Sequence, residues 1–405
     1  MSVVRQAIPV ARPVLDRREA EAAGRAVLSG WVTQGPEVQA FERSFASAVG
    51  APHACAVSNC TVALHLALRA AGVSPGDEVI TVSHSFIASA NAIRYCGAIP
   101  VFVDIGEGTF NIDASRVEGA IGPRTRAILA VHQLGMPCDL AKLVAIARRR
   151  YLPLIEDAAC AAGSEVMWEG RWESIGRPHG DVACFSFHPR KVITTGDGGM
   201  ITTRHEDWDR QFRLWRQHGM SISDAVRHQS PEVAFEEYPT IGYNYRMTDI
   251  QAAVGREQLE RLPEIIERRR VLADRYRERI VVRVPQVSLP VEPAWARSNW
   301  QSFCVRLPQN VDQRAVMQTM LDRGVSTRRG VMCAHQETAY AKEPWHCEKR
   351  GPVSCMCGPR RCRALANSER ATREGLILPL FPQMTDVDQD EVIDALAAAI
   401  GLCAV

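Results

Sequence analysis

The chain has 405 residues, of which 46% are apolar and 23% are charged, and its formal net charge is +2. These values are typical of a globular protein with one large or two ordinary domains, and they exclude a strong general attraction to nucleic acid or to a membrane surface. The sequence lacks an apolar run long enough to span a membrane and the apolar core of a signal peptide. We therefore expect a cytoplasmic protein whose 13 cysteines are mostly free thiols.

Short strand-like runs alternate with helical patterns from about residue 50. The strand-like runs are HACAVS, DEVITV, IPVFVD, RTRAILAVH, YLPLIED and DVACFSF. A helical pattern separates many of them, for example DLAKLVAIARRR after the fourth run. This alternation predicts βαβ units, and hence an α/β protein with a mainly parallel sheet and helices on both faces.

The second half of the chain has a different pattern. A charged segment with helical apolar spacing runs from about 248 to 280, with Pro263 as the expected break. The strand-like SFCVRLP and helical patterns over 312–323 and DQDEVIDALAAAI then indicate a small α+β domain. We predict a large α/β domain with an N-terminal arm over 1–250, and a linker helix with the small domain over 251–405. A Cys-rich loop near 335–366 interrupts the latter.

Three polar features follow strands of the predicted sheet, at the edge where ligands usually bind. Ser58 and Thr61 lie where a strand ends and a helix begins, a position suited to a phosphate or to a plain helix cap. Asp157 ends a buried strand, where a carboxylate needs a cationic partner unless it is a cap or a surface acid. Lys191 is either a solvated strand-end residue or an amine whose pKa is lowered by desolvation, suited to Schiff-base chemistry.

Taken singly, each of these features is weak evidence for a cofactor site. A phosphate site, an acid and a lysine in this order on one sheet match the three groups that pyridoxal phosphate requires: an anchor for the phosphate, a partner for the ring nitrogen and an amine. Three glycines after the lysine would leave room for a planar ligand, namely Gly196, Gly198 and Gly199.

Three longer stretches carry a family resemblance: IEDAACAAGS, FSFHPRKVITTGDGGM and GYNYRMTDIQAA. With them, most of the chain resembles the DegT/DnrJ/StrS sugar aminotransferases, which are fold-type I pyridoxal-phosphate enzymes. The resemblance implies a seven-stranded sheet, bound pyridoxal 5'-phosphate and a homodimer with shared active sites. It also implies amino transfer from glutamate to a keto-sugar, nucleotide-linked in most of the family, in amino-sugar or antibiotic biosynthesis.

The resemblance also assigns roles to individual residues. Lys191 would form the Schiff base and then shuttle a proton, with Asp157 keeping the ring nitrogen protonated and His188 as a further catalytic residue. Phe86 would stack on the cofactor ring. The other cofactor contacts would be Ser58, Thr61, the Val62 amide, Cys160, Ser186 and, from the neighbouring subunit, Asn244.

The sequence departs from the family at several positions. Cys160 stands where the family usually has Gln, and Cys60 where it often has Gly. The stretch STRRGVMCAH, residues 326–335, also differs from the usual substrate-proximal pattern. Arg328, Arg329 and His335 in this stretch are candidate substrate residues, with a solvated pair as the alternative for the two arginines. The resemblance adds Arg246, which lies beside Asn244 and near the substrate.

A cluster of four cysteines lies in HCEKRGPVSCMCGPRRC: Cys347, Cys355, Cys357 and Cys362. Together with His346 they could bind a structural zinc, but their spacing is not one of the familiar paired patterns. Unligated thiols are the expected state, so we predict no metal.

Alternative functions remain open at this point. The acceptor could be a keto-cyclitol or another ketone without a nucleotide. A deoxysugar dehydratase of the same fold would have His in place of Lys191, so the lysine argues against that activity. A non-catalytic, regulatory protein that binds pyridoxal phosphate has partial support from the altered Cys60 and Cys160 positions.

Overall fold

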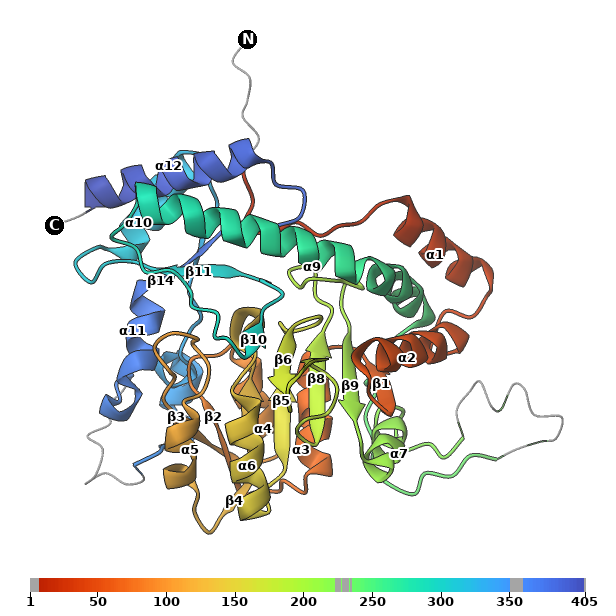
Figure 1. Ribbon diagram of the computed structural model, residues 1–405. Coiled ribbons are helices and arrows are strands. Elements are labelled where there is room, and N and C mark those ends of the chain that lie inside the picture. Colours follow the sequence, from red (N-terminus) through yellow and green to blue (C-terminus); the bar gives the residue numbers. More distant parts are fainter. Residues whose placement is uncertain (1–6, 223–226, 228–232, 234, 350–359, 404–405) are drawn as a thin grey trace.

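The computed structural model describes residues 7–222, 227, 233, 235–349 and 360–403. A large sheet forms the centre of the first half of the chain (Figure 1), with the strand order β1-β9-β8-β5-β4-β2-β3-β13. β9 is antiparallel to both of its neighbours, and the remaining pairs are parallel. The strands are His53–Val57 (β1), Glu78–Val82 (β2), Ile99–Val103 (β3), Thr125–Val131 (β4), Leu154–Asp157 (β5), Val182–Ser186 (β8), Gly199–Thr203 (β9) and His346–Cys347 (β13).

The predicted mainly parallel α/β sheet is confirmed, with one addition. Seven of its strands come from residues 53–203, and the eighth, β13, comes from the Cys-rich region that the sequence presented as a loop. His346 pairs with Val101 and Cys347 with Phe102, so β13 covers the open edge of β3. A two-residue strand has too little pattern of its own to be seen in the sequence.

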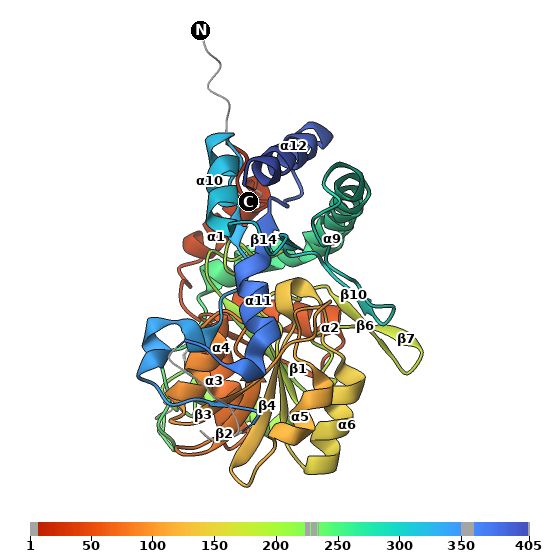
Figure 2. The same cartoon turned by 90° about the vertical axis from the view of Figure 1, so that its left-hand side faces the viewer.

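Helices cover both faces of the sheet because its central strands are apolar on both sides. Figure 2 shows α3 and α4 on one side and α5 and α6 on the other. The helices of this half are Arg17–Leu28 (α1), Pro36–Val49 (α2), Cys60–Ala70 (α3), Ala88–Tyr95 (α4), Ala114–Ala120 (α5), Leu140–Arg150 (α6) and Glu206–Trp215 (α7).

The long helix α9, Asp249–Arg283, runs across the top of the sheet in Figure 1. It begins with a capping box, in which Thr248 and Gln251 satisfy each other's backbone amides. The predicted break at Pro263 is wrong, because the helix continues through this residue. Its neighbours Leu262 and Ile265 are buried in the core, and this packing holds the helix together although Pro263 donates no hydrogen bond.

The last part of the chain forms a second sheet with the order β11-β14-β12, covered by helices. Its core includes Phe303, Leu376 and Val392, and the later turns of α9 contribute Leu272 and Tyr276. The elements are Phe303–Arg306 (β11), Gln313–Asp322 (α10), Arg328–Arg329 (β12), Ala366–Glu374 (α11), Gly375–Leu378 (β14) and Asp386–Cys403 (α12). α9 therefore contributes to two cores, and the division near residue 250 stays a prediction.

Smaller elements complete the fold. A third sheet consists of Glu165–Trp168 (β6), Arg171–Ser174 (β7) and Ala296–Arg297 (β10), and short 3-10 turns cover Gln133–Gly135 (η1), Ala334–Gln336 (η2), Thr338–Ala341 (η3) and Arg363–Leu365 (η4). Within the described part of the chain, no helix combines the length and the apolar character that crossing a bilayer requires.

Candidate active site

The candidate catalytic residues lie at the ends of two adjacent parallel strands. Asp157 is the last residue of β5 and pairs with Cys184 on β8. β8 ends at Ser186, and the turn that follows carries Lys191, whose backbone N–H donates to the His188 carbonyl at 2.8 Å. Because the carboxyl ends of parallel neighbours meet at the same edge, the sheet brings Asp157 and Lys191 together.

Lys191 is the only one of the chain's four lysines that is not exposed, and the structure describes all four. Its Nζ donates to the Sγ of Cys160 at 3.1 Å. Burial lowers the pKa of Lys191, but the neighbouring Cys160, Cys60 and Asp157 more than offset this and raise the pKa above its ordinary value. The expectation of a lowered pKa is therefore wrong for this arrangement of side chains.

Asp157 is a buried carboxylate with neutral hydrogen-bond donors. Its Oδ2 accepts from the Ser89 hydroxyl at 2.7 Å, and its Oδ1 accepts from the Ala159 N–H at 3.1 Å. Burial raises the pKa of Asp157, against the opposing effect of these two donors and of Lys191. Ser85 extends the chain of hydroxyls at 2.9 Å from Ser89. A cation placed against this carboxylate would be strongly favoured.

The turn at the start of α3 differs in detail from the expectation. The helix cap is Asn59, whose side chain accepts from the Val62 N–H at 3.1 Å, rather than Ser58 or Thr61. The Ser58 N–H instead donates to the Tyr245 carbonyl at 2.8 Å. Ser58, Thr61 and Val62 are all partly exposed, so a phosphate can reach this helix N-terminus.

The glycine-rich turn leads into β9, which packs closely on this helix start. A Cβ on Gly199 would lie 2.5 Å from the carbonyl carbon of Asn59 and 2.8 Å from the Cys60 nitrogen. Gly196 instead has φ of +83°, which a residue with a side chain rarely adopts. Glycine is therefore required at both positions by the backbone: at Gly196 by its conformation and at Gly199 by lack of space. Gly199 sets how closely the lysine-bearing turn approaches the turn at the start of α3.

The other candidate cofactor contacts are accessible. Phe86 follows β2 and is 63% exposed, which is unusual for a phenylalanine and leaves its face free to stack. Ser186 is partly buried and Asn244 is exposed. His188 is also exposed, and its Nδ1 accepts from the Arg190 N–H at 3.2 Å, so it caps its own turn. The roles of these residues remain predictions.

The candidate substrate residues are not gathered in one place. Arg246 is partly buried and follows Tyr245 beside the α3 turn. Arg328 and Arg329 form β12 in the second sheet and are exposed, and Arg329 pairs with Glu337 at 3.1 Å.

His335 has a different environment from the one expected. Its ring is buried, with Nδ1 2.6 Å from the Ser83 hydroxyl and Nε2 3.3 Å from Glu369. Both nitrogens are thus engaged inside the protein, so the structure gives no support to a substrate contact, and that role of His335 stays a prediction. The backbone of the same segment donates from Ala334 to the Ser83 carbonyl at 2.8 Å, so His335 supports the loop that carries Phe86.

The sequence missed several residues that shape the site. Ser89 and Asn59 are described above. Asn299 comes from far along the chain, and its side chain donates to the carbonyls of Cys160 at 2.8 Å and Ala162 at 2.9 Å. It holds the loop that follows Asp157. The only signal for these residues was a small polar side chain next to a motif, which is too common to be informative alone.

The zinc alternative lies partly outside the described residues, because Cys355 and Cys357 fall in the undescribed segment. Cys347 and Cys362 are buried in one apolar cluster with Phe102 and Tyr340. Among the residues that the structure describes, no group of three or more side chains could hold a metal ion.

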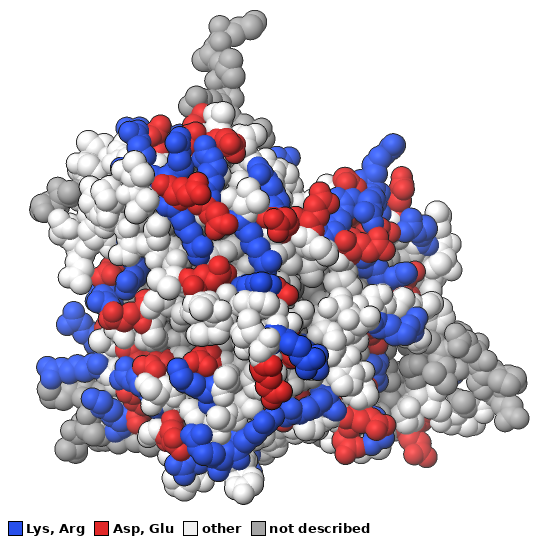
Figure 3. All heavy atoms as spheres, viewed as in Figure 1, with Lys and Arg blue, Asp and Glu red and all other residues white. Residues whose placement is uncertain are grey.

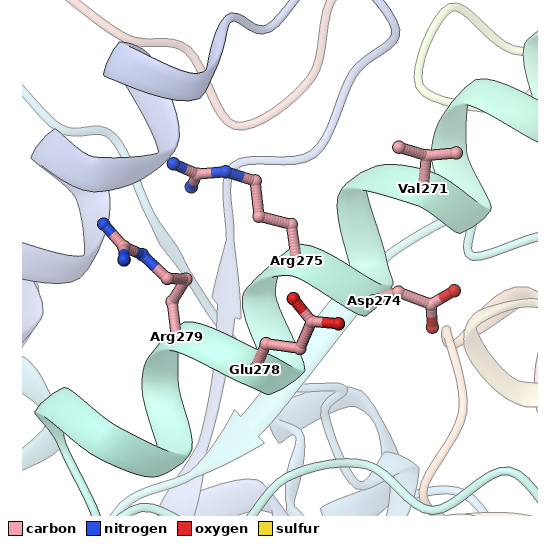
Figure 4. A pocket seen from close by; sticks show the side chains of 5 residues that line it. All are labelled: Val271, Asp274, Arg275, Glu278 and Arg279. Atoms are coloured by element: carbon pink, nitrogen blue, oxygen red, sulfur yellow. The ribbon is translucent and has the colours of Figure 1, made fainter.

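A surface hollow of about 500 Å³ on α9 is separate from these residues (Figure 4). Its lining is Val271, Asp274, Arg275, Glu278 and Arg279. Arg275 and Arg279 extend toward α12, where they pair with Asp390 at 2.9 and 3.2 Å. These charges join two helices, so the hollow does not compete with the strand-end cluster as a reaction site.

The strand-end cluster fits pyridoxal phosphate. The buried Asp157 carboxylate suits a protonated pyridine nitrogen, the accessible Phe86 suits stacking on a ring, and the start of α3 suits a phosphate. The Lys191 amine contacts Cys160, three residues after Asp157, and is close enough to Asp157 for the carboxylate to raise its pKa. These features define a fold-type I pyridoxal-phosphate enzyme.

Comparisons with known proteins agree. Residues 13–397 match the model of the DegT/DnrJ/EryC1/StrS aminotransferase family. The chain is 36% identical over 392 residues to the spore coat polysaccharide biosynthesis protein SpsC of Bacillus subtilis (strain 168), with 96% of each chain covered. It is 33% identical to the aminotransferase TlmJ from Streptoalloteichus hindustanus, with a TM-score of 0.84 and coverage of 98% and 99%. DesV of S. venezuelae, solved in complex with a ketimine intermediate, is 32% identical with the same TM-score and coverage.

The chain therefore belongs to the DegT/DnrJ/EryC1/StrS aminotransferase family. The predicted family, fold class and cofactor are confirmed: the protein is a pyridoxal-phosphate-dependent aminotransferase. The roles of its individual residues rest on the geometry described above.

Proposed function

We propose that the protein transfers an amino group from glutamate to the keto group of a nucleotide-linked sugar during amino-sugar biosynthesis. The single observation that carries this proposal is the juxtaposition of Lys191 with the buried Asp157 carboxylate at the end of β5. The similarity to a polysaccharide biosynthesis protein of Bacillus subtilis supports a sugar acceptor.

Pyridoxal phosphate, when bound, supplies an electron sink that accepts an amino group from a donor and returns it to a ketone. Asp157 would keep the ring nitrogen protonated, since burial leaves its carboxylate in need of a cation. Lys191 would hold the cofactor through its Nζ and, once free, would move the proton at the reacting carbon of the substrate.

Three structural features orient the cofactor. The N–H groups at the start of α3 and the Thr61 hydroxyl would hold the phosphate, Ser186 would add a hydroxyl from the end of β8, and Phe86 would cover one face of the ring. Cys160 lies beside Lys191 and would contact the hydroxyl of the cofactor ring. A thiol there donates a weaker hydrogen bond than the amide usual at this position.

We also propose that the active unit is a homodimer. Asn244 is exposed, and it follows a stretch with several exposed apolar side chains, including Phe235 at 85% and Ile241 at 88%. Exposed apolar groups of this size are typical of an interface. Asn244 would then reach the phosphate of the other subunit, and Arg246 would lie close to the acceptor.

Glutamate addition to the purified enzyme tests the donor. The visible absorbance of the lysine-bound cofactor should fall, and 2-oxoglutarate should appear in equal amount. Keto-sugar nucleotides and keto-cyclitols are then offered separately to the aminated enzyme. Recovery of the absorbance only with keto-sugar nucleotides supports the proposal, and recovery only with keto-cyclitols refutes the sugar assignment. A coloured protein that no amino donor changes would instead be a non-catalytic binding protein.

A further inference from the structure

The contact between Lys191 and Cys160 has a chemical consequence of its own. The amine and the thiol are 3.1 Å apart, and both residues are partly exposed. Small reagents can therefore reach the pair. An amine held this close to a sulfur atom is positioned to attack it once the sulfur carries a leaving group.

The other thiols of the described chain are less suited to oxidation. All of them except Cys160 and Cys403 are buried. Burial raises the pKa of Cys55 to about 12 and those of Cys60 and Cys184 well above the usual value, so these sulfurs stay protonated. Cys403 lies near the Thr319 hydroxyl at 3.9 Å, in the last turn of α12. Cys160 is thus the thiol that combines access with an adjacent amine.

We propose that hydroperoxides convert Cys160 and Lys191 into a covalent sulfur–nitrogen crosslink, which makes the pair a redox modification site. In the first step the Cys160 sulfur attacks a peroxide oxygen, the O–O bond breaks, and an alcohol leaves, or water where the oxidant is hydrogen peroxide; the sulfur is oxidised to sulfenic acid and the peroxide is reduced. In the second step the Lys191 ammonium group first gives one proton to solvent, and the resulting neutral amine attacks this sulfur. The S–O bond breaks, an S–N bond forms, and the hydroxyl leaves as water with a proton from the amine.

The crosslink occupies the same nitrogen that binds the cofactor. Pyridoxal phosphate bound to Lys191 therefore protects the lysine, whereas the free amine is exposed to the reaction. Thiol reductants attack the S–N bond and restore both side chains. This consequence depends on the proposed role of Lys191, but formation of the crosslink depends only on the geometry of the two side chains.

Peptide mass spectrometry of the full-length chain, stripped of cofactor and treated with hydrogen peroxide, tests the proposal. We expect the Cys160 and Lys191 peptides to be joined, with a combined mass lower by two hydrogens than that of the separate peptides, and to separate after dithiothreitol. Holoenzyme treated in parallel should contain several-fold less of the linked species. Cys160→Ser should abolish it, whereas Cys403→Ser and Lys142→Arg should leave it unchanged.

Three results would overturn the proposal: Cys160 recovered as sulfinic acid without a link, Cys160 joined to another cysteine, or both side chains recovered unmodified. The mass measurement is independent of turnover. A protein that forms the crosslink but never binds cofactor at Lys191 would refute the proposed function and leave this inference intact.

Discussion

Asp157 is the residue whose charge the proposed chemistry needs most. Asp157→Asn keeps the size of the side chain and a hydrogen bond with Ser89, but it removes the negative charge that holds the ring nitrogen protonated. We expect kcat to fall by about 10²–10³-fold, as when other preorganised electrostatic groups are removed. Steady-state kinetics with glutamate measure this effect.

A matched control for this variant is Asp113→Asn, because Asp113 is a carboxylate that caps α5 rather than facing the site. It should leave kcat within a factor of about two and change stability little, because Asn caps a helix about as well as Asp does. An Asp157→Asn enzyme with wild-type kcat would show that the ring nitrogen does not depend on this carboxylate.

His84 predicts a pH effect on stability. Burial lowers the pKa of His84 from 6.5 to about 3, and neither ring nitrogen has a hydrogen-bond partner in the described structure. As the pH falls through 6.5, His84 therefore takes up a proton in the unfolded chain but stays neutral in the folded protein. The contribution of His84 is complete above pH 6.5 and is lost as the pH falls toward 3.

The free energy of unfolding from urea titrations measures this loss. Between pH 6 and 5 it should fall by about 1 kcal/mol more in the wild type than in His84→Phe, which keeps a ring against Phe110. Both proteins retain the other buried histidines, so the difference isolates His84. Equal slopes would contradict the assignment.

The sequence predicted the candidate catalytic residues better than the residues that hold them in place. Lys191 and Asp157 could be found because each breaks the apolar pattern at a strand end. Ser89 and Asn299 could not, because their contacts join segments that are distant in the chain. The environment of His335 could not be predicted for the same reason: its partners, Ser83 and Glu369, become neighbours only in the folded protein.

Among the elements, β9 and α3 depend on each other through a single glycine. In Gly199→Ala the new Cβ would meet the backbone of Asn59 and Cys60 at 2.5–2.8 Å, and neither backbone can yield easily. We expect a loss of about 1–3 kcal/mol in the free energy of unfolding. We also expect weaker cofactor binding, measured by titration of the absorbance with pyridoxal phosphate.

The control is Gly24→Ala in α1, where the added Cβ has nothing within 4 Å. Alanine is the better helix former, so stability should stay unchanged or rise by up to about 1 kcal/mol. Full cofactor affinity in Gly199→Ala would mean that the approach of β9 does not set the phosphate turn.

Secondary structure was predictable where periodicity was strong and failed where packing decides. The strands β1, β2, β3, β4, β5 and β8 follow from their apolar patterns, whereas β6, β7 and β9 were not predicted. A proline normally ends a helix, and Pro263 does not, because its neighbours in the helix are buried in the core. β13 adds to the edge of β3 through only two residues, which no pattern could indicate.

For the whole molecule, charge argues for a small-molecule enzyme. Figure 3 shows Lys and Arg interspersed with Asp and Glu over the visible face, without a field of one sign. This agrees with the net charge of +2, and on this face a polyanion would meet no extended basic surface.

Subunit mixing tests the proposed shared site. Lys191→Ala and Asn244→Ala should each lose most activity at limiting cofactor. In a mixed dimer, one site contains the intact lysine of one subunit and the intact asparagine of the other. Mixing equal amounts under conditions of subunit exchange should restore up to about a quarter of wild-type activity. No recovery, with dimer exchange confirmed, would mean that Asn244 acts within its own subunit.

Reduction with borohydride followed by peptide mass spectrometry tests the central assignment most directly. The reagent fixes pyridoxal phosphate to the lysine that binds it, and the chain offers four lysines. Lys142, Lys342 and Lys349 are exposed, and only Lys191 lies beside Asp157 and Cys160. We expect one modified peptide, carrying the cofactor on Lys191, and none in Lys191→Ala. Cofactor fixed to any other lysine, or retained covalently in Lys191→Ala, would contradict the assignment.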